Sequence, residues 1–531
     1  MSRSLTVPFT ILVTVSAVLA PWLGLLLSGD GTPVGLPADP ADVVVQGDSD
    51  VYDAVWHFWW TERALSGSLD PMFCPLVFHP RGASMAMHNI GWPSTLALAN
   101  PLVSADPVIA LNTALFLGTA IVFAAGVLLA RQWGAGWDGA FLAGFIVALM
   151  PSRAGHLYQH YMIAQMGWGM LSLYFFTNCL KRGRGLPFAA LFAGLATLES
   201  FYHVIFICFG AVAVMILLKG RFTKGRAIRA LASLAAGVAL AAIWFIPRGG
   251  GISAEPMTWR EAVHWSAEPL SYLMPSPFGL AGTVFSLPLK QCWMPNAFEG
   301  NVSFGLSVLV VFILTCAAKR RWALCLIVLS IVLLSLGPLL KWKGTPTSLV
   351  LPWMAPARLS LLANARVPAR LAMLAGAIAA VTAGVAYGGL KPLLRNLVLF
   401  FVLFELFIPV FPTLSASVPD ACLRATGPVL DLPAGCMTRI TAFYQTRHGQ
   451  PRLTAFLARG GFKALEDAGL NGLLMGDSSI VTADVLTGTT AETALYHRML
   501  LEPVQRALYD SLYAPAFPSG TQDDSVWVWQ R

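Results

Sequence analysis

The stretch "LTVPFTILVTVSAVLAPWLGLLL", residues 5–27, decides the class of fold. It contains no charged side chain and is long enough for an α-helix to cross a bilayer, which takes about 20 residues. It is longer than the apolar core of a secretory signal peptide, and no clear small-residue cleavage site precedes Asp30. We therefore interpret it as a retained transmembrane anchor.

Similar apolar stretches recur as far as residue 413 of the 531-residue chain, of which 56% is hydrophobic and only 12% is charged. These stretches are continuous rather than alternating. This favours helices over a closed barrel, because the backbone groups in lipid must be satisfied internally. The formal net charge of +8 does not indicate nucleic-acid binding, since basic residues collect in the cytoplasmic loops of membrane proteins.

Three basic clusters, at 181–184, 219–229 and 319–321, set the orientation. With these clusters and Arg3 in the cytoplasm, the sequence predicts a mainly α, polytopic membrane protein of about eleven spans with a cytoplasmic N-terminus. The expected spans lie near 5–27, 106–130, 138–151, 161–180, 186–218 (two short spans meeting at Glu199), 229–246, 303–318, 322–340, 366–387 and 392–412. Two large loops, 28–105 and 247–302, then face outward.

The last part of the chain has ordinary polarity. We expect a transmembrane domain over 1–413 and a small extracytoplasmic α/β domain over 414–531, which is long enough to fold compactly. The run "GPVLDLP" (427–433) is typical of a β-strand, and 484–513 contains helix-like stretches. No internal repeat is evident, so an inverted-repeat transporter gains no support.

The first outer loop carries an unusual concentration of acids in "VVVQGDSDVYDAVWHFWWTERAL", residues 43–65. Apolar side chains follow these acids at helical spacing, at Val51, Tyr52, Val55, Trp56 and Trp59. Because Trp and Tyr favour the membrane–water boundary, we expect this helix to lie flat on the outer surface of the membrane. The alternative is that the polar residues of this stretch have a purely structural role.

In that alternative, Ser49 or Asp50 caps the helix and Asp53 pairs with His57 one turn later.

Almost all of the unusual polar residues, including the acids of this stretch, fall in the expected outer loops or at the outer ends of the expected spans. They are Asp48, Asp50, Asp53, His57, His79, His88, His156, His160, Glu199, His203, Glu299, Arg366 and Arg370. Ionisable groups at membrane depth are costly and mark functional sites. Their gathering on one side predicts a single extracytoplasmic site rather than a conduit through the bilayer.

Two pairs in this set have the spacing of one helical turn. Arg366 and Arg370 are four residues apart, which suits phosphate binding on one helical face, with snorkelling to the interface as the alternative. His156 and His160 could bind metal or phosphate, or could sit at a polar boundary. Glu299 precedes a span, where a solvated acid without a function is also acceptable.

The cysteines agree with this sidedness. Cys74, Cys292, Cys422 and Cys436 lie outside, where disulfides form. The short loop between Cys422 and Cys436 makes them the favoured pair, with Cys74–Cys292 second. Free thiols throughout are the alternative.

Five stretches together resemble the C-type (GT-C) membrane glycosyltransferases, and more narrowly a bacterial group of them. They are "GDSDVYDAVWHFWWTERAL" (47–65), "MPSRAGHLYQHYMIAQMGW" (150–168), "FEGNVSFG" (298–305), "LLANARVPARLAML" (361–374) and "GPVLDLPAG" (427–435). The protein O-mannosyltransferases and aminoarabinose transferases of this superfamily carry an Asp-Glu pair in the first loop, where this chain has Asp48 and Asp50. The "DSD" also resembles the DxD that binds a divalent metal in oligosaccharyltransferases, so Mg²⁺ or Mn²⁺ at these two acids is left open.

The resemblance implies an inverting enzyme of the bacterial inner membrane. It would transfer a sugar from a polyprenyl-phosphate donor to an extracytoplasmic glycan, lipid or protein, with membrane lipids and no nucleic acid as partners. Asp50, with Asp48 second, is the expected general base, and Arg366 and Arg370 the expected phosphate ligands. The other expected substrate contacts are His156, His160, Glu299, Asp53 and His57.

This assignment requires Asp50 and Arg370 to converge beside the outer leaflet. An O-antigen-ligase-like transferase, a transporter or flippase, and a non-catalytic scaffold are the rival functions.

Overall fold

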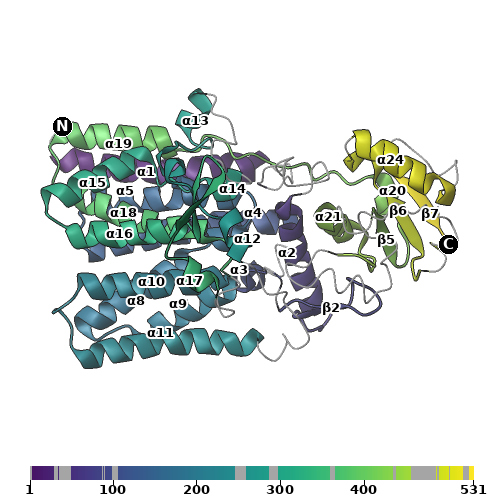
Figure 1. Cartoon of the computed structure of the whole chain (residues 1–531), viewed down its shortest axis with the longest axis horizontal. Helices are drawn as coiled ribbons and strands as arrows, with labels where there is room; N and C mark the ends of the chain where they lie inside the picture. Colours follow the sequence, from purple (N-terminus) through teal and green to yellow (C-terminus); the bar gives the residue numbers. More distant parts are fainter. Residues whose placement is uncertain are drawn as a thin grey trace. The chain divides into compact units, whose positions relative to one another are not determined.

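The computed structural model describes residues 3–28, 34, 49–86, 88, 90–98, 106–245, 259–285, 297–358, 365–433, 438–455, 486, 489–501, 503–517 and 526–531. The chain divides into two compact units, coloured along the sequence in Figure 1. The first unit comprises Met1–Asp30, Leu115–Ile243 and Pro256–Phe411, and the second comprises Gly31–Ala114, Trp244–Glu255 and Pro412–Arg531.

The first unit is built mainly of helices. They are α1 (Arg3–Ser28), most of α4 (Pro107–Gln132), α5 (Trp137–Leu149), α6 (Pro151–Leu157), α7 (Tyr161–Ala164), α8 (Gly167–Arg182), α9 (Leu186–Glu199), α10 (Phe201–Leu217), α11 (Lys224–Phe245), α12 (Trp259–His264), η2 (Pro269–Leu273), α13 (Leu280–Val284), α14 (Ala297–Gly300), α15 (Leu306–Ala318), α16 (Trp322–Ser335), α17 (Met354–Ala357), η4 (Pro368–Leu371), α18 (Ala372–Tyr387) and α19 (Pro392–Leu406). One antiparallel hairpin, β3 (Leu339–Trp342) with β4 (Thr345–Val350), follows α16.

Three helices of the described chain are long and apolar enough to cross a membrane: 107–132, 224–245 and 368–387. A fourth crossing is available if α5 and α6, bent by 49°, act as one span, and five shorter apolar helices accompany them. The predicted pair of short helices over 186–218 is confirmed, with Glu199 at their junction. The predicted span over 322–340 is wrong at its end, because α16 stops at Ser335 and the hairpin begins at Leu339.

The helices α5 and α18 cross at two glycines. A Cβ atom on Gly139 would lie 2.0 Å from the carbonyl oxygen of Gly384, and one on Gly384 would lie 2.4 Å from that of Gly139. Small residues at such crossings let helix backbones approach, which is how helices pack in membranes. This contact fixes α18 against α5, and these two helices continue into the segments that carry Arg370 and His156.

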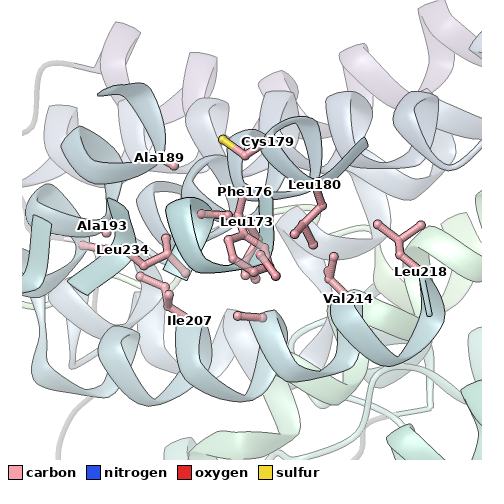
Figure 2. Close-up of a cluster of buried hydrophobic side chains, with 14 residues drawn as sticks. Leu173, Phe176, Cys179, Leu180, Ala189, Ala193, Ile207, Val214, Leu218 and Leu234 are labelled. Atoms are coloured by element: carbon pink, nitrogen blue, oxygen red, sulfur yellow. The ribbon is translucent and has the colours of Figure 1, made fainter. Parts of the chain in front are cut away.

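The helices α8 to α11 bury a separate apolar cluster, drawn in Figure 2. Its larger members come mainly from α8 and α10, for example Leu173 and Phe176, both buried. The fully buried members from α9 are small, at Ala189, Ala193 and Ala196. Alternating large and small side chains fill the space between the helices closely.

The second unit combines the segment between α1 and α4 with the C-terminal tail. Its elements are α2 (Asp50–Ser66), β1 (Phe73–Cys74), β2 (Ala83–Ser84), α3 (Trp92–Leu98), α20 (Asp420–Leu423), β5 (Val429–Leu432), α21 (Thr438–His448), β6 (Thr493–Tyr496), η6 (Arg498–Leu500), α24 (Pro503–Tyr513), η7 (Ala514–Ala516) and β7 (Trp527–Gln530). Strand β6 is central, parallel to β5 and antiparallel to β7.

The predicted strand over 427–433 is confirmed as β5. The helix-like reading of 484–513 is wrong for 493–496, where β6 lies between two partners with all four residues buried. Among the described residues of this stretch, α24 is helical as expected. The burial of a central strand outweighs weak local helix propensity.

The Trp-rich helix α2 packs against α21 rather than presenting an open apolar face. Trp56 is 3% exposed, and its indole N–H donates to Oε1 of Gln445 over 2.8 Å. The Tyr52 hydroxyl donates to the Ser415 carbonyl over 2.9 Å, and the Tyr52 ring meets that of Phe443 at 5.3 Å. The apolar stripe that suggested a helix lying on the membrane is therefore covered by the protein's own tail.

Candidate functional site

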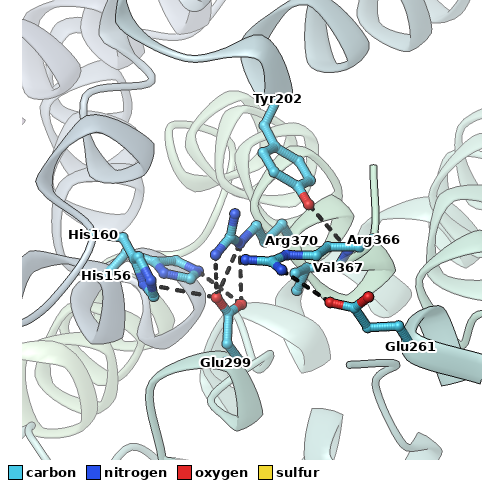
Figure 3. Close-up of polar contacts among 8 residues, drawn as sticks. All are labelled: His156, His160, Tyr202, Glu261, Glu299, Arg366, Val367 and Arg370. Carbon is cyan, nitrogen blue, oxygen red and sulfur yellow. Dashed lines mark hydrogen bonds and ion pairs between the residues drawn. The ribbon is translucent and has the colours of Figure 1, made fainter. Parts of the chain in front are cut away.

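A buried polar cluster lies in the first unit, where α6, α14 and η4 meet (Figure 3). The Nε–H of Arg370 donates to both carboxylate oxygens of Glu299, over 3.0 and 3.2 Å, and Nη2 donates to Oε1. His156 Nε2 and His160 Nδ1 lie 3.8 and 3.7 Å from the same carboxylate. The structure thus brings together four of the predicted substrate contacts, which are far apart in the sequence.

Tyr202 completes the cluster from α10. Its ring lies under the guanidinium of Arg370, 4.5 Å from Cζ to the ring centroid, and its hydroxyl accepts from the backbone N–H of Val367 over 3.0 Å. A cation over an aromatic face is stabilised by the ring quadrupole. Tyr202 was not among the site residues predicted from the sequence. Its place between the polar residues Glu199 and His203 was a signal that could have found it.

Local sequence explains how His156 reaches Glu299. Pro151 cannot continue α5 and instead begins α6 after a bend, because proline lacks a backbone donor and restricts the preceding residue. Gly155 then lets α6 lie against α14: a Cβ there would be 2.8 Å from the carbonyl oxygen of Phe298. His156 directly follows Gly155, and Glu299 directly follows Phe298. The close contact of the two backbones therefore places His156 and Glu299 near each other in the cluster.

The charge state of Glu299 follows from its neighbours. Burial alone would raise its pKa, but Arg370 first, and then His156 and His160, lower the pKa to about 2. Glu299 is 4% exposed and stays ionised at neutral pH. It therefore holds the guanidinium in a fixed orientation through a two-bonded fork.

Arg366 does not share this cluster. Its Nη1 donates to Oε1 of Glu261 on α12 over 2.9 Å, and both side chains are about one-third exposed. The expected common helical face with Arg370 is wrong, because Pro368 begins η4 and Val367 before it is not helical (φ −113°, ψ 80°). Its role as a phosphate ligand stays a prediction.

The predicted base, Asp50, is the first residue of α2 in the second unit. Ser49 precedes it as the N-cap, and its Oγ accepts from the Val51 N–H over 3.4 Å. The Oδ1 atom of Asp50 forms an ion pair with Nε of Arg439 on α21. Asp50, one of the two predicted metal ligands, is thus already paired with a cation. Asp48, the other predicted ligand, lies outside the described residues. The convergence of Asp50 with Arg370, which belongs to the other unit, stays a prediction.

Asp53 and His57 form a second buried group, together with His88. Oδ2 of Asp53 lies 3.2 Å from His57 Nε2 and 3.5 Å from His88 Nε2, and the two nitrogens are 3.0 Å apart. Burial would raise the pKa of Asp53, but His88 and His57 together lower it well below its usual range. Burial lowers the pKa of His57 despite the nearby Asp53 carboxylate.

The structural alternative from the sequence is thus present in both parts, as the Ser49 cap and as the Asp53–His57 contact. His88 is the partner that the sequence did not assign. The predicted disulfide between Cys422 and Cys436 stays a prediction, because Cys436 lies outside the described residues, as does Cys292 of the second pair.

Comparison with known proteins places the fold. No family model matches the chain, and no curated protein matches it in sequence. Among solved structures, ArnT from Cupriavidus metallidurans is similar over 98% of this chain and 97% of its own, with a TM-score of 0.50 and 12% identity. The oligosaccharyltransferase AglB from Archaeoglobus fulgidus matches over 95% of this chain and 69% of its own, with a TM-score of 0.49 and 12% identity.

The likeness to ArnT is structural, and at 12% identity it shows the fold alone. The chain has the fold of the GT-C membrane glycosyltransferases, as the sequence resemblance predicted. Its similarity to ArnT extends over nearly the whole of both chains.

Proposed function

We propose that this protein is an integral membrane glycosyltransferase. It transfers a sugar from a polyprenyl-phosphate donor to a hydroxyl group of an extracytoplasmic glycan, lipid or protein. The observation that carries the proposal is the buried Arg370–Glu299–His156–His160 cluster, in a fold shared along its length with ArnT. ArnT has been crystallised bound to undecaprenyl phosphate, a lipid of the proposed donor class.

Arg370 is the proposed ligand of the lipid phosphate. A guanidinium has five N–H donors in a rigid fork that matches phosphate oxygens. Because Glu299 and Tyr202 fix the plane of the guanidinium, the cation is oriented before the substrate arrives. A fixed cation aimed at developing negative charge lowers the barrier to departure of the phosphate.

The cluster can also contact the sugar or the acceptor. His156 and His160 offer imidazole nitrogens on one side of Glu299, and such groups exchange hydrogen bonds with hydroxyls. Arg366, bound to Glu261, is a second candidate for the phosphate.

Asp50 is the proposed general base, with Asp48 as the alternative. The acceptor oxygen attacks the anomeric carbon from the face opposite the phosphate, so the configuration inverts. The new C–O bond forms as the sugar–phosphate bond breaks, the acceptor proton passes to the carboxylate, and the polyprenyl phosphate leaves with the bonding electrons. Arg439 would hold the Asp50 carboxylate in place for this transfer.

The proposed setting is the inner membrane of a bacterium, with the N-terminus in the cytoplasm and the tail outside. The three basic clusters at 181–184, 219–229 and 319–321 support this orientation, because basic residues collect on the cytoplasmic side of membrane proteins.

The test is release of free carrier lipid by the purified full-length protein. The protein would be incubated with a panel of labelled polyprenyl-phosphate sugars and cell-envelope acceptors. We expect one donor to be consumed, with Asp50→Asn reducing turnover by about 10²-fold or more, as for loss of a general base. Arg370→Lys should raise the donor concentration needed for half-maximal rate, because lysine cannot form the planar fork.

Arg447→Lys is the matched control, since Arg447 forms a partly exposed pair with Asp106 over 3.0 Å and should tolerate the exchange. Normal turnover by both Asp50→Asn and Asp48→Asn would disprove the base. Accumulation of an unchanged lipid-linked sugar in reconstituted vesicles, with no carrier released, would show that the protein is a transporter and not a glycosyltransferase.

A further inference from the structure

The group formed by Asp53, His57 and His88 has the geometry of metal ligands. Its three facing atoms form a nearly equilateral triangle with sides of 3.0, 3.2 and 3.5 Å. The point equidistant from these atoms lies about 1.9 Å from each, close to zinc–nitrogen and zinc–oxygen bonds of about 2.0–2.2 Å. An ion slightly out of this plane would have three bonds of normal length without any side chain moving.

Hydrogen bonding alone does not account for the triangle. An imidazole nitrogen either donates or accepts, and an ionised carboxylate only accepts. If both Nε2 atoms carry hydrogen, the two donors face each other over 3.0 Å. If either lacks it, that nitrogen and the carboxylate oxygen face each other as two acceptors, over 3.2 Å for His57 or 3.5 Å for His88. A cation in the centre makes all three contacts favourable at once.

The surroundings suit a structural ion. Asp53, His57 and His88 are 6%, 1% and 6% exposed, so little bulk water can compete for an ion at this position. A cavity of about 10 Å³ adjoins Asp53 beside Trp56, Val77 and Met85. That volume is about what one water molecule requires, and water would supply a fourth ligand.

We propose that Asp53, His57 and His88 bind a structural Zn²⁺ ion. Two imidazoles and one carboxylate form an established zinc ligand set. The ion links α2, which carries Asp53 and His57, to the segment between β2 and α3, which carries His88. It thereby stabilises the helix whose first residue is Asp50.

The cluster around Glu299 is not proposed to hold an ion. Its ligand atoms also lie close together, but the guanidinium of Arg370 is bonded to both oxygens of the carboxylate. A metal there would have to displace this cation. The two groups therefore give different expectations, and one zinc site per chain is expected.

The first test is the zinc content of the purified full-length protein after gel filtration, measured by mass spectrometry. We expect close to one zinc per chain in the wild type and in His156→Ala. In His88→Ala the affinity should fall by more than about 100-fold, because even loss of a supporting contact costs metal sites 10- to 100-fold. Zinc lost from His156→Ala and retained in His88→Ala would move the site to the other cluster and overturn the proposal.

His88→Cys provides a second test that does not depend on a loss. X-ray absorption at the zinc edge should show two nitrogen ligands in the wild type and a new Zn–S distance of about 2.3 Å in the variant. Chelation of zinc from the wild type should lower its thermal midpoint, and this effect should be absent in His88→Ala. A wild-type protein that contains no zinc and gains no stability when titrated with Zn²⁺ would refute the proposal.

Discussion

The exchange Glu299→Gln tests whether the buried cluster is held by charge. In the wild type, the carboxylate accepts from both Nε and Nη2 of Arg370, and it is 4% exposed. Glutamine is nearly isosteric, but it has one acceptor oxygen, and its amide N–H₂ would face the donors of Arg370. The exchange therefore removes one arm of the fork and leaves a guanidinium whose side chain is 10% exposed without an opposite charge.

The magnitude follows from this burial. Removing one partner of a buried pair costs about 3–5 kcal/mol, because the remaining charge stays desolvated. The ring of Tyr202 still faces the guanidinium of Arg370 and offsets part of this, about 0.5–2 kcal/mol. The expected net loss is about 1–4.5 kcal/mol, which at about 2 °C per kcal/mol corresponds to a fall of about 2–9 °C in the midpoint of thermal unfolding.

Glu261→Gln is the matched control. It makes the same chemical change opposite Arg366, but that pair is about one-third exposed on both sides. Exposed pairs contribute about 1 kcal/mol or less. Both variants would be purified in the same detergent, and their unfolding followed by intrinsic fluorescence and by loss of the monodisperse peak on gel filtration.

Equal midpoints for the two variants would refute the reasoning, since burial would then have no effect on the value of the pair. A larger fall of the unfolding midpoint in Glu261→Gln than in Glu299→Gln would show that the Glu261–Arg366 pair, and not the Glu299–Arg370 pair, stabilises the fold. A large loss restricted to Glu299→Gln would show that Arg370 is oriented by charge.

Three further results are expected. Gly155→Ala should cost about 1–3 kcal/mol and slow carrier release at least about tenfold, because its Cβ would press on the Phe298 carbonyl; unchanged kinetics would contradict the close α6–α14 contact. The stability difference between wild type and Glu299→Gln should persist down to pH 4.5 and vanish only as the pH falls toward about 2, because the folded-state pKa of Glu299 lies below the ordinary value of 4.5. Denaturation series at several pH values would measure this difference. A difference already lost at pH 4.5 would contradict the prediction. Trp56→Phe should destabilise the second unit by about 1–3 kcal/mol, because it leaves Oε1 of Gln445 buried without its donor; limited proteolysis would detect the loosened unit, and wild-type resistance would argue against this bond.

The helical class and much of the cluster could be predicted from the sequence for physical reasons. Long apolar stretches can satisfy their backbone in lipid only as helices, and buried ionisable residues are rare enough to be conspicuous. His156, His160, Glu299 and Arg370 were selected in this way, and the structure brings them together. Their exact partners were beyond prediction, because these depend on backbone contacts such as that of Gly155 with Phe298.

Two errors have a common cause. Arg366 and Arg370 were placed on one helical face by their spacing, and α2 was placed on the membrane by its Trp and Tyr side chains. Spacing predicts a shared face only where the helix is continuous, and Pro368 interrupts it. An apolar stripe on a helix indicates that the stripe is covered, but it does not show whether lipid or protein covers it. Here α21 covers the stripe of α2.

The covering of α2 gives the C-terminal tail a role in the proposed chemistry. The tail contributes Ser415, Phe443 and Gln445 to the burial of the Trp-rich helix, and it contributes Arg439 to the carboxylate of Asp50. A general base requires a fixed position, because proton transfer depends on hydrogen-bond distance. In the proposed mechanism, the role of the residues after 412 is therefore to hold Asp50 in position through Arg439.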